Sequence, residues 1–182
     1  MSTITEKVIF VFSLLALAGC ASSRANGGPY GFGTTPAPGD LAAFYSIPAD
    51  GRGLPAGEGT YAQGQKVYAG KCAACHGDKL QGVAGAGEAL IGGRGTLASG
   101  KGMKTIESYW PYATTVFDYV KRAMPFNSPG SLTDNETYAV TAYILAEAKI
   151  IDKDTVINAA SLSKVRMPNA EGFVPDPRPD VP

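Results

Sequence analysis

The string CAACH at residues 72–76 carries the chemistry that stands out in this chain. Two cysteines separated by two residues and followed at once by a histidine are the attachment signature of a c-type haem. This spacing puts both thiols on one turn of chain, where each can add to a vinyl group of the porphyrin and form a thioether. The motif therefore predicts one covalently bound haem c, held by Cys72 and Cys75, with His76 as the iron ligand.

A C-x-x-C pair can also belong to a zinc site or to a redox dithiol, but neither alternative accounts for the whole CAACH motif. A zinc site needs two further Cys or His ligands, but the chain has one histidine and three cysteines in all. A thioredoxin-like dithiol belongs near a strand-helix-strand pattern, whereas here a helical pattern precedes the motif and a glycine-rich stretch follows it. Haem attachment is the interpretation that uses every residue of the string.

The second axial position of the iron is left to a methionine, a lysine or no ligand, because there is no second histidine. Methionine is the natural candidate, and Met103, Met124 and Met167 follow the initial methionine. Met124 is favoured because it ends an amphipathic helical pattern just before Pro125, which turns the chain. Filling the core is the ordinary alternative for each of them. A pair of His76 and Met124 leaves no open position on the iron and suits electron transfer rather than oxygen chemistry.

Trp110 is a further candidate for contact with the haem. Haem propionates are anionic and need hydrogen-bond donors, and the indole N–H is such a donor. Trp110 lies just before the helical pattern that ends at Met124. Simple packing in the core is an equally good interpretation of this side chain. Arg122 lies within the same pattern, and there a solvated surface charge is the better interpretation.

Three helices are predicted around these residues. The first begins at a capping box that starts with Thr60 and leads into the cysteines. The second covers residues 115–123 and has Thr114 or Thr115 as its cap. The third begins at a second capping box, at Thr133, and runs to about residue 148. The stretch 77–102 is too rich in glycine for a long regular element and is predicted to be a loop along one haem edge.

The ends of the chain have different compositions. Residues 1–19 are predicted to be a lipoprotein signal peptide, because a short apolar run follows Lys7 and ends in LAGC, which resembles a bacterial lipobox; an uncleaved anchor is the alternative. Cys20 is then lipidated, which predicts a location on the periplasmic side of a bacterial membrane. Residues 20–58 are a Gly/Pro-rich tether, 59–148 the folded domain, and 149–182 an extended Pro-rich tail.

The charge balance excludes one class of partner. The chain has 16 basic and 16 acidic residues and no basic run interleaved with aromatic residues, which excludes nucleic-acid binding. With Cys20 assigned to lipid and the other two cysteines to haem, none remains for a disulfide. No internal repeat supports a second haem.

The order of these elements resembles class I cytochrome c over residues 59–148. The resemblance rests on the first helix, the C-x-x-C-H motif, the glycine loop, the helix that ends in Met124-Pro125 and the capped last helix. It implies an all-α fold with a few helices around one haem. In that family the first and last helices cross where a glycine faces an aromatic residue, and Gly64, Tyr68 and Tyr143 match this arrangement.

Longer strings are similar to the cytochrome subunit of bacterial sulfite or sulfane dehydrogenase. They are SYWPYATT at 108–115, RAMPFN at 122–127, and the tail with MPN at 167–169 and GFVPDPRP at 172–179. This resemblance implies a non-catalytic subunit that accepts electrons from a periplasmic, molybdenum-containing dehydrogenase and passes them to a soluble cytochrome c or an oxidase. The tail would then wrap the partner, and a disordered terminus is the alternative.

Two other functions remain open from the residues alone. One is a stand-alone, membrane-tethered electron shuttle to a terminal oxidase. The other is an enzyme or gas sensor with five-coordinate haem, which is disfavoured because no distal histidine or other acid/base group would stand beside a vacant position.

Overall fold

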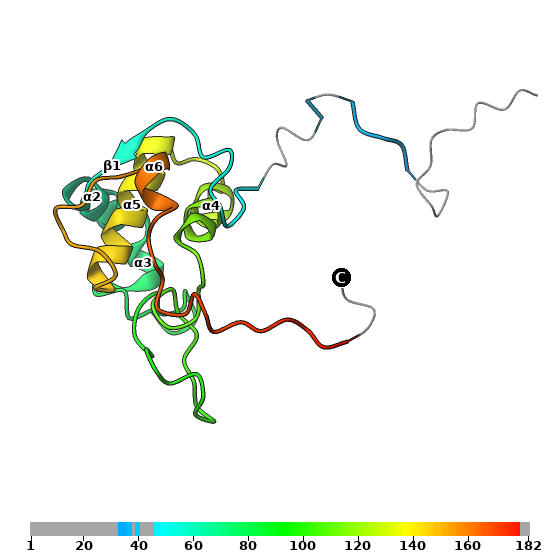
Figure 1. The fold of residues 1–182 in the computed structure, drawn as a ribbon. Helices are drawn as coiled ribbons and strands as arrows, with labels where there is room; N and C mark the ends of the chain where they lie inside the picture. The colour runs from blue at the N-terminus through cyan, green and yellow to red at the C-terminus, as the bar shows by residue number, and fades with distance from the viewer. Residues whose placement is uncertain (1–32, 38, 41–45, 179–182) are drawn as a thin grey trace, which may run out of the picture. The chain divides into compact units, whose positions relative to one another are not determined.

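The computed structural model describes residues 33–37, 39–40 and 46–178, which belong to two units that divide between residues 45 and 46. The first unit contributes one short turn, in which the Asp40 carboxylate accepts from the Ala37 amide at 2.7 Å. All helices and strands of the described residues lie in the second unit (Figure 1). They are β1 (Glu58–Gly59), α2 (Tyr61–Lys71), α3 (Ala73–His76), α4 (Ala113–Ala123), α5 (Asp134–Glu147), β2 (Ile157–Asn158) and α6 (Ala159–Leu162).

The predicted signal peptide at 1–19 and the lipidation site Cys20 lie outside the described residues. Both therefore stay predictions. In the part of the chain that the structure describes, no helix combines the length and the apolar character that crossing a bilayer requires.

Both predicted capping boxes are present and start their helices where expected. At α2, the Thr60 hydroxyl accepts from the Gln63 amide, and the Gln63 side chain accepts from the Thr60 amide at 2.9 Å. At α5, Thr133 and Glu136 make the same reciprocal pair. Each box satisfies two backbone donors that the first helical turn would otherwise leave without partners.

Helices α2 and α5 cross in close contact, and this crossing confirms the fold that the family resemblance implied (Figure 1). The contact point is Gly64, where an added Cβ would overlap the carbonyl oxygen of Ala139 and lie 2.7 Å from the Tyr143 Cβ. The Tyr68 and Tyr143 rings pack beside it with centroids 5.1 Å apart. The helices can approach this closely only because residue 64 has no side chain.

Helix α4 begins two residues earlier than predicted, at Ala113, and the predicted caps are wrong. Its N-cap residue is Tyr112, which makes no side-chain cap. The two threonine hydroxyls donate to carbonyl groups instead: Thr115 to Tyr112 at 2.8 Å, and Thr114 to Ala49 at 3.0 Å. The second of these bonds reaches a segment 65 residues earlier in the chain, which local sequence patterns do not reveal.

The predicted tether, 20–58, is wrong for its last part. Residues 46–58 lie against the helices: the Ile47 amide donates to the Asp118 carboxylate at 2.8 Å, and the Tyr138 hydroxyl donates to the Pro55 carbonyl at 2.8 Å. The folded unit therefore begins at residue 46 rather than 59.

The predicted tail, 149–182, is wrong for its first part. Residues of β2 pair antiparallel with β1, and Glu58 lies opposite Asn158. Three apolar side chains, Ile157 in β2 and Leu162 and Met167 after it, are almost fully buried in the core. Their spacing of five residues fits neither a helix nor a strand period, so no amphipathic pattern announced them. From residue 172 to 178 the chain has no regular structure, as predicted.

We expect Gly64→Ala to destabilise the holoprotein by about 3 kcal/mol or more, because the new methyl group forces the two helix backbones apart. Gly70→Ala is the matched control. Gly70 lies in the same helix, and a Cβ there meets no atom within 4 Å. That change should stabilise the protein by up to about 1 kcal/mol, because alanine is the better helix former. Denaturant unfolding measures both, and equal effects would contradict the crossing.

An ion pair that joins α2 to α5 predicts a specific pH dependence. The Lys71 ammonium lies 2.8 Å from the Glu136 carboxylate. Its hydrogen bond to this carboxylate, together with the one that the Thr133 backbone amide donates, lowers the pKa of Glu136 to about 2. Because the folded-state pKa lies below the ordinary value, this stabilisation is present above about pH 4.5 and is lost as the pH falls toward 2.

Glu136→Gln removes this titration while its amide can still complete the capping box, as Gln63 does at α2. The melting temperature of the natural protein should therefore fall more steeply between pH 4.5 and pH 2 than that of the variant. Thermal unfolding over this pH range measures the two slopes. Identical slopes would show that the pair contributes nothing to stability.

Candidate functional site

The C-x-x-C-H motif forms a helical turn directly after α2. Cys72 ends α2 and begins α3, and its carbonyl accepts from the amides of Cys75 and His76 at 3.1 and 2.9 Å. Both thiols are free of disulfide bonds. Cys72 is half-buried against the hydrophobic core, whereas Cys75 is exposed. The two thiols and the imidazole thus come from a single turn that the α2–α5 crossing holds in place.

The state of the Cys72 thiol argues against a redox dithiol. Burial raises its pKa to about 11, so the thiol keeps its proton at neutral pH. Reactive dithiols work the other way, because their surroundings lower the cysteine pKa and supply the thiolate. A zinc site has no support either, since no group of three metal-ligating Cys, His, Asp or Glu side chains occurs within the described residues.

The His76 ring is held by a backbone carbonyl. Its Nδ1 atom lies 2.7 Å from the Glu88 carbonyl oxygen, which can only accept a hydrogen bond. Nδ1 therefore carries a proton, and Nε2 is the ring nitrogen that can serve as a metal ligand. The backbone of His76 is tied to the same loop, because its carbonyl accepts from the Gly82 amide at 2.7 Å.

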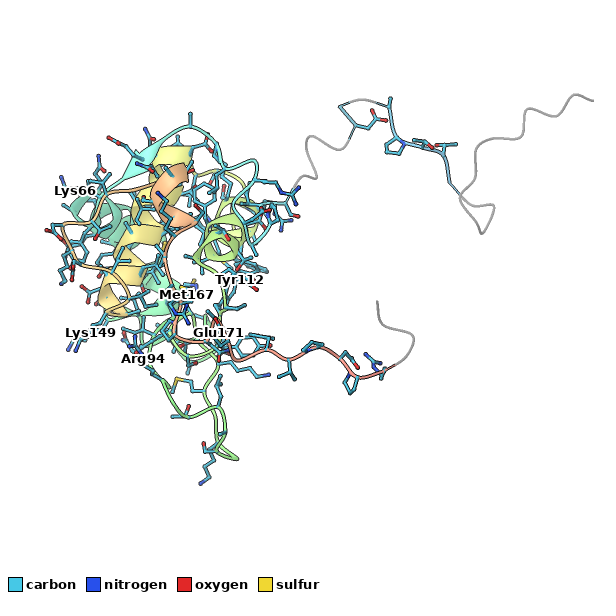
Figure 2. All side chains as sticks on the ribbon, viewed as in Figure 1. Lys66, Arg94, Tyr112, Lys149, Met167 and Glu171 are labelled. Carbon is cyan, nitrogen blue, oxygen red and sulfur yellow. The ribbon has the colours of Figure 1, made fainter. Side chains whose placement is uncertain are left out.

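The loop predicted for residues 77–102 has no helix or strand but is firmly held at several points. The Tyr68 hydroxyl donates to the Gly77 carbonyl at 2.7 Å. The Arg94 side chain pairs with Glu107 at 3.0 Å and donates to the Ala148 carbonyl at the end of α5 at 2.6 Å. Figure 2 shows Arg94 and Lys149 on the same side of the second unit. The glycines permit the tight path, and these side chains fix it.

The three candidate methionine ligands lie in different surroundings. Met103 is 48% exposed on the loop, and its backbone is held by the hydroxyls of Thr96 and Ser108. Met167 is 2% exposed and fills the core. Met124 lies between these extremes: it is half-buried at the C-terminus of α4 and packs against the core. Met124 as the second ligand stays a prediction.

Trp110, the predicted haem contact, is half-buried and packs against the core. Its ring meets Tyr119 of α4 edge-on, with centroids 5.7 Å apart. Its indole N–H has no hydrogen-bond partner among the residues that the structure describes. Arg122 has a structural partner instead, because its guanidinium donates to Asp118 at 3.0 and 2.5 Å. The Arg122 side chain is 50% exposed, so it is a surface charge as interpreted from the sequence, and it is paired with Asp118.

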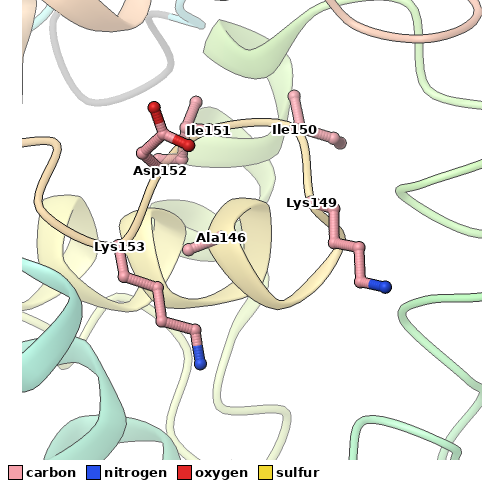
Figure 3. A pocket seen from close by; sticks show the side chains of 6 residues that line it. All are labelled: Ala146, Lys149, Ile150, Ile151, Asp152 and Lys153. Carbon is pink, nitrogen blue, oxygen red and sulfur yellow. The ribbon is translucent and has the colours of Figure 1, made fainter.

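A surface pocket of about 330 Å³ lies apart from these residues, at the C-terminal end of α5 (Figure 3). Its lining includes no thiol, imidazole or thioether. The ammonium of Lys153 is already paired with Glu147 at 2.8 Å and with the Tyr61 hydroxyl at 2.9 Å. The pocket is therefore not the candidate site. The residues that line it are Ala146, Lys149, Ile150, Ile151, Asp152 and Lys153.

The sequence did not predict that Glu88 holds the His76 ring. The acceptor for His76 is its backbone carbonyl, which every residue has, so residue type gives no signal. The glycines around it were the only indication that the backbone makes close contacts there.

Comparisons with known proteins decide the family. The model of the family described as Cytochrome c matches residues 61–147, from the start of α2 to the end of α5. A crystal structure of the sulfane dehydrogenase SoxCD from Paracoccus pantotrophus contains a chain that is 41% identical. The match covers 82% of this chain and 74% of that one, with a TM-score of 0.74. This chain belongs to the cytochrome c family.

A curated relative of this cytochrome c is a thiosulfate dehydrogenase from Stutzerimonas stutzeri (strain A1501). It is 32% identical over 116 residues, which cover 62% of this chain and 35% of that protein. The chain thus spans about a third of the length of this relative.

Membership of the cytochrome c family implies a covalently bound haem c and electron transfer. The donor set in this structure fits that group. Two free thiols lie on one turn, and the imidazole beside them uses Nδ1 for the Glu88 carbonyl, so Nε2 is the nitrogen that could bind the iron. A haem bound here would supply an iron that changes its charge by one electron, and the protein supplies the attachment, the ligand and its orientation.

Proposed function

We propose that this cytochrome c carries one haem, attached to Cys72 and Cys75, with His76 and Met124 as the axial ligands of the iron. In this proposal the protein transfers single electrons as a subunit of an oxidoreductase. The observation that carries this proposal is the His76 ring, held at Nδ1 by the Glu88 carbonyl, beside two free thiols in a chain that has no second C-x-x-C-H motif. Trp110 supports the haem by donating its indole N–H to a propionate.

Met124 is the methionine whose burial suits a second ligand. A thioether that binds the iron must be shielded from solvent, but it must not be enclosed by the core. Met124 meets both conditions, because it lies half-buried at the C-terminus of α4. Met167 is enclosed by core side chains, and Met103 lies largely in solvent. A His/Met pair raises the reduction potential and leaves no open position on the iron.

Replacing Met124 by Ala should leave the haem attached but lower the reduction potential by more than about 100 mV, within the roughly 0.8 V over which axial ligands set haem potentials. The reduced variant should also bind carbon monoxide, because a coordination position becomes free. Spectroelectrochemical titration and absorbance spectroscopy measure the two effects. Met103→Ala is the control and should change neither. A reversed pattern would make Met103 the ligand.

The proposed electron donor is a periplasmic dehydrogenase that oxidises sulfur compounds and contains molybdenum, and the acceptor is a soluble cytochrome c or an oxidase. The likeness to a chain of the sulfane dehydrogenase SoxCD supports this role. The name of the curated relative, thiosulfate dehydrogenase, also points to sulfur chemistry. Lipid on Cys20 would hold the protein at the periplasmic side of a bacterial membrane.

The segment 172–178 is the proposed contact with the dehydrogenase. It contains Phe173, whose ring meets the Tyr109 ring edge-on with centroids 5.3 Å apart, and Val174, which is 84% exposed. Pro175 and Pro177 rule out a helix there and favour an extended conformation that is already ordered before it binds. The Asp176 carboxylate pairs with the Arg178 guanidinium at 2.6 Å, so these two charges neutralise each other.

Deleting residues 175–182 keeps the contact between Phe173 and Tyr109 and should slow haem reduction by the dehydrogenase at least about tenfold, since each 1.4 kcal/mol of lost docking is tenfold. Stopped-flow absorbance with the sulfane dehydrogenase catalytic subunit measures this rate. The reduction potential should stay unchanged, which serves as the control. Equal rates would remove the segment from the interface, and no reduction of the natural protein would favour a stand-alone shuttle.

A further inference from the structure

Gly87 lies against the backbone of Cys75. A Cβ placed on Gly87 would lie 2.8 Å from the Cys75 carbonyl oxygen and 3.2 Å from the Cys75 Cβ. Neither neighbour is the end of a flexible side chain, so neither can easily move away. The φ angle of Gly87 lies outside the left-handed region. Space, and not backbone conformation, therefore requires a glycine at this position.

The carbonyl that holds the His76 ring belongs to the next residue. Glu88 accepts from His76 Nδ1 at 2.7 Å. The short loop from Gly82 to Glu88 is closed by two bonds between Val83 and Gly87, at 2.9 and 3.1 Å. Its first residue donates to the carbonyl of His76 at 2.7 Å. The loop thus hydrogen-bonds to the backbone of His76 at one end and to its ring at the other. Gly87 determines how closely the end that carries Glu88 approaches Cys75.

We propose that Gly87 is a positioning residue for the iron ligand His76. Its missing side chain lets the loop approach Cys75 closely enough to keep the Glu88 carbonyl within hydrogen-bond distance of Nδ1. The inference rests on the proposed function in one respect, that His76 ligates the haem iron. A hydrogen bond at Nδ1 makes the opposite nitrogen a stronger donor to the iron and fixes the plane of the ring. A stronger donor favours the oxidised iron and keeps the reduction potential lower.

Two alanine substitutions in the glycine-rich stretch 77–102 test this proposal in the full-length holoprotein. Gly87→Ala pushes the Glu88 carbonyl away from the ring. Gly100→Ala is the matched control, because a Cβ there meets no atom within 4 Å and the φ angle of Gly100 also lies outside the left-handed region. The readouts are the reduction potential, by spectroelectrochemical titration, and the solvent exchange of the His76 Nδ1 proton, by NMR spectroscopy.

In Gly87→Ala the potential should rise, and the Nδ1 proton should exchange about tenfold faster or more, in line with the usual cost of losing a partner of a metal ligand. Gly100→Ala should match the natural protein in both readouts. A low-spin spectrum with unchanged potential and exchange in Gly87→Ala would overturn the role of Gly87. A natural protein without histidine ligation would instead overturn the proposed function, so the two failures are distinguishable.

A second variant covers the case in which Gly87→Ala does not assemble with haem. Replacing Ala89 by its hydroxy-acid analogue, lactic acid, turns the Glu88 carbonyl into an ester carbonyl, which accepts hydrogen bonds less strongly and adds no atom that needs space. The potential should again rise and the Nδ1 proton should exchange faster. If the ester variant behaves like the natural protein, the bond that Gly87 is proposed to preserve has no effect on the iron, and the proposal fails.

Discussion

The close approach of α2 and α5 at Gly64 is the contact on which the rest of the site depends. No side chain separates the two helices there, and the Tyr68 and Tyr143 rings fill the space beside the crossing. Helix α2 runs directly into the turn that carries Cys72 and His76, so the crossing also sets where the thiols and the imidazole emerge from the core. The Tyr68 hydroxyl extends this control to the chain just after the motif, at Gly77.

Around His76 the protein uses backbone groups rather than charged side chains. The ring donates to the Glu88 carbonyl, and the main chain of His76 accepts from Gly82. Carbonyl and amide groups neither titrate nor rotate freely, so they keep a metal ligand in one tautomer and one orientation. The part of the loop around Arg94 is fixed as well, because Arg94 bonds to Glu107 and to the Ala148 carbonyl at the end of α5. A fixed tautomer and orientation of the ligand suit an electron carrier, whose iron changes its charge by one electron.

The segments on either side of the cytochrome c match enlarge a core that would otherwise be small. Residues 46–58 bond to α4 and α5, and residues 157–167 insert Ile157, Leu162 and Met167. The pairing of β1 with β2 brings these two segments together. A domain of this size gains a large fraction of its stability from such additions, because small domains bury a smaller share of their surface.

The sequence by itself determined the attachment turn, the starts of α2 and α5, the glycine at their crossing and the glycine-rich loop. In each case side-chain chemistry at a fixed local spacing carries the signal, as in the two capping boxes. Only the tertiary structure decided the rest. The start of α4, the folding of 46–58 and 149–167, and the Glu88 carbonyl beside His76 all depend on contacts between residues far apart in the chain or on backbone atoms. An isolated apolar residue or a backbone carbonyl has no distinguishing pattern in the sequence. Its contacts are determined only by how the chain packs.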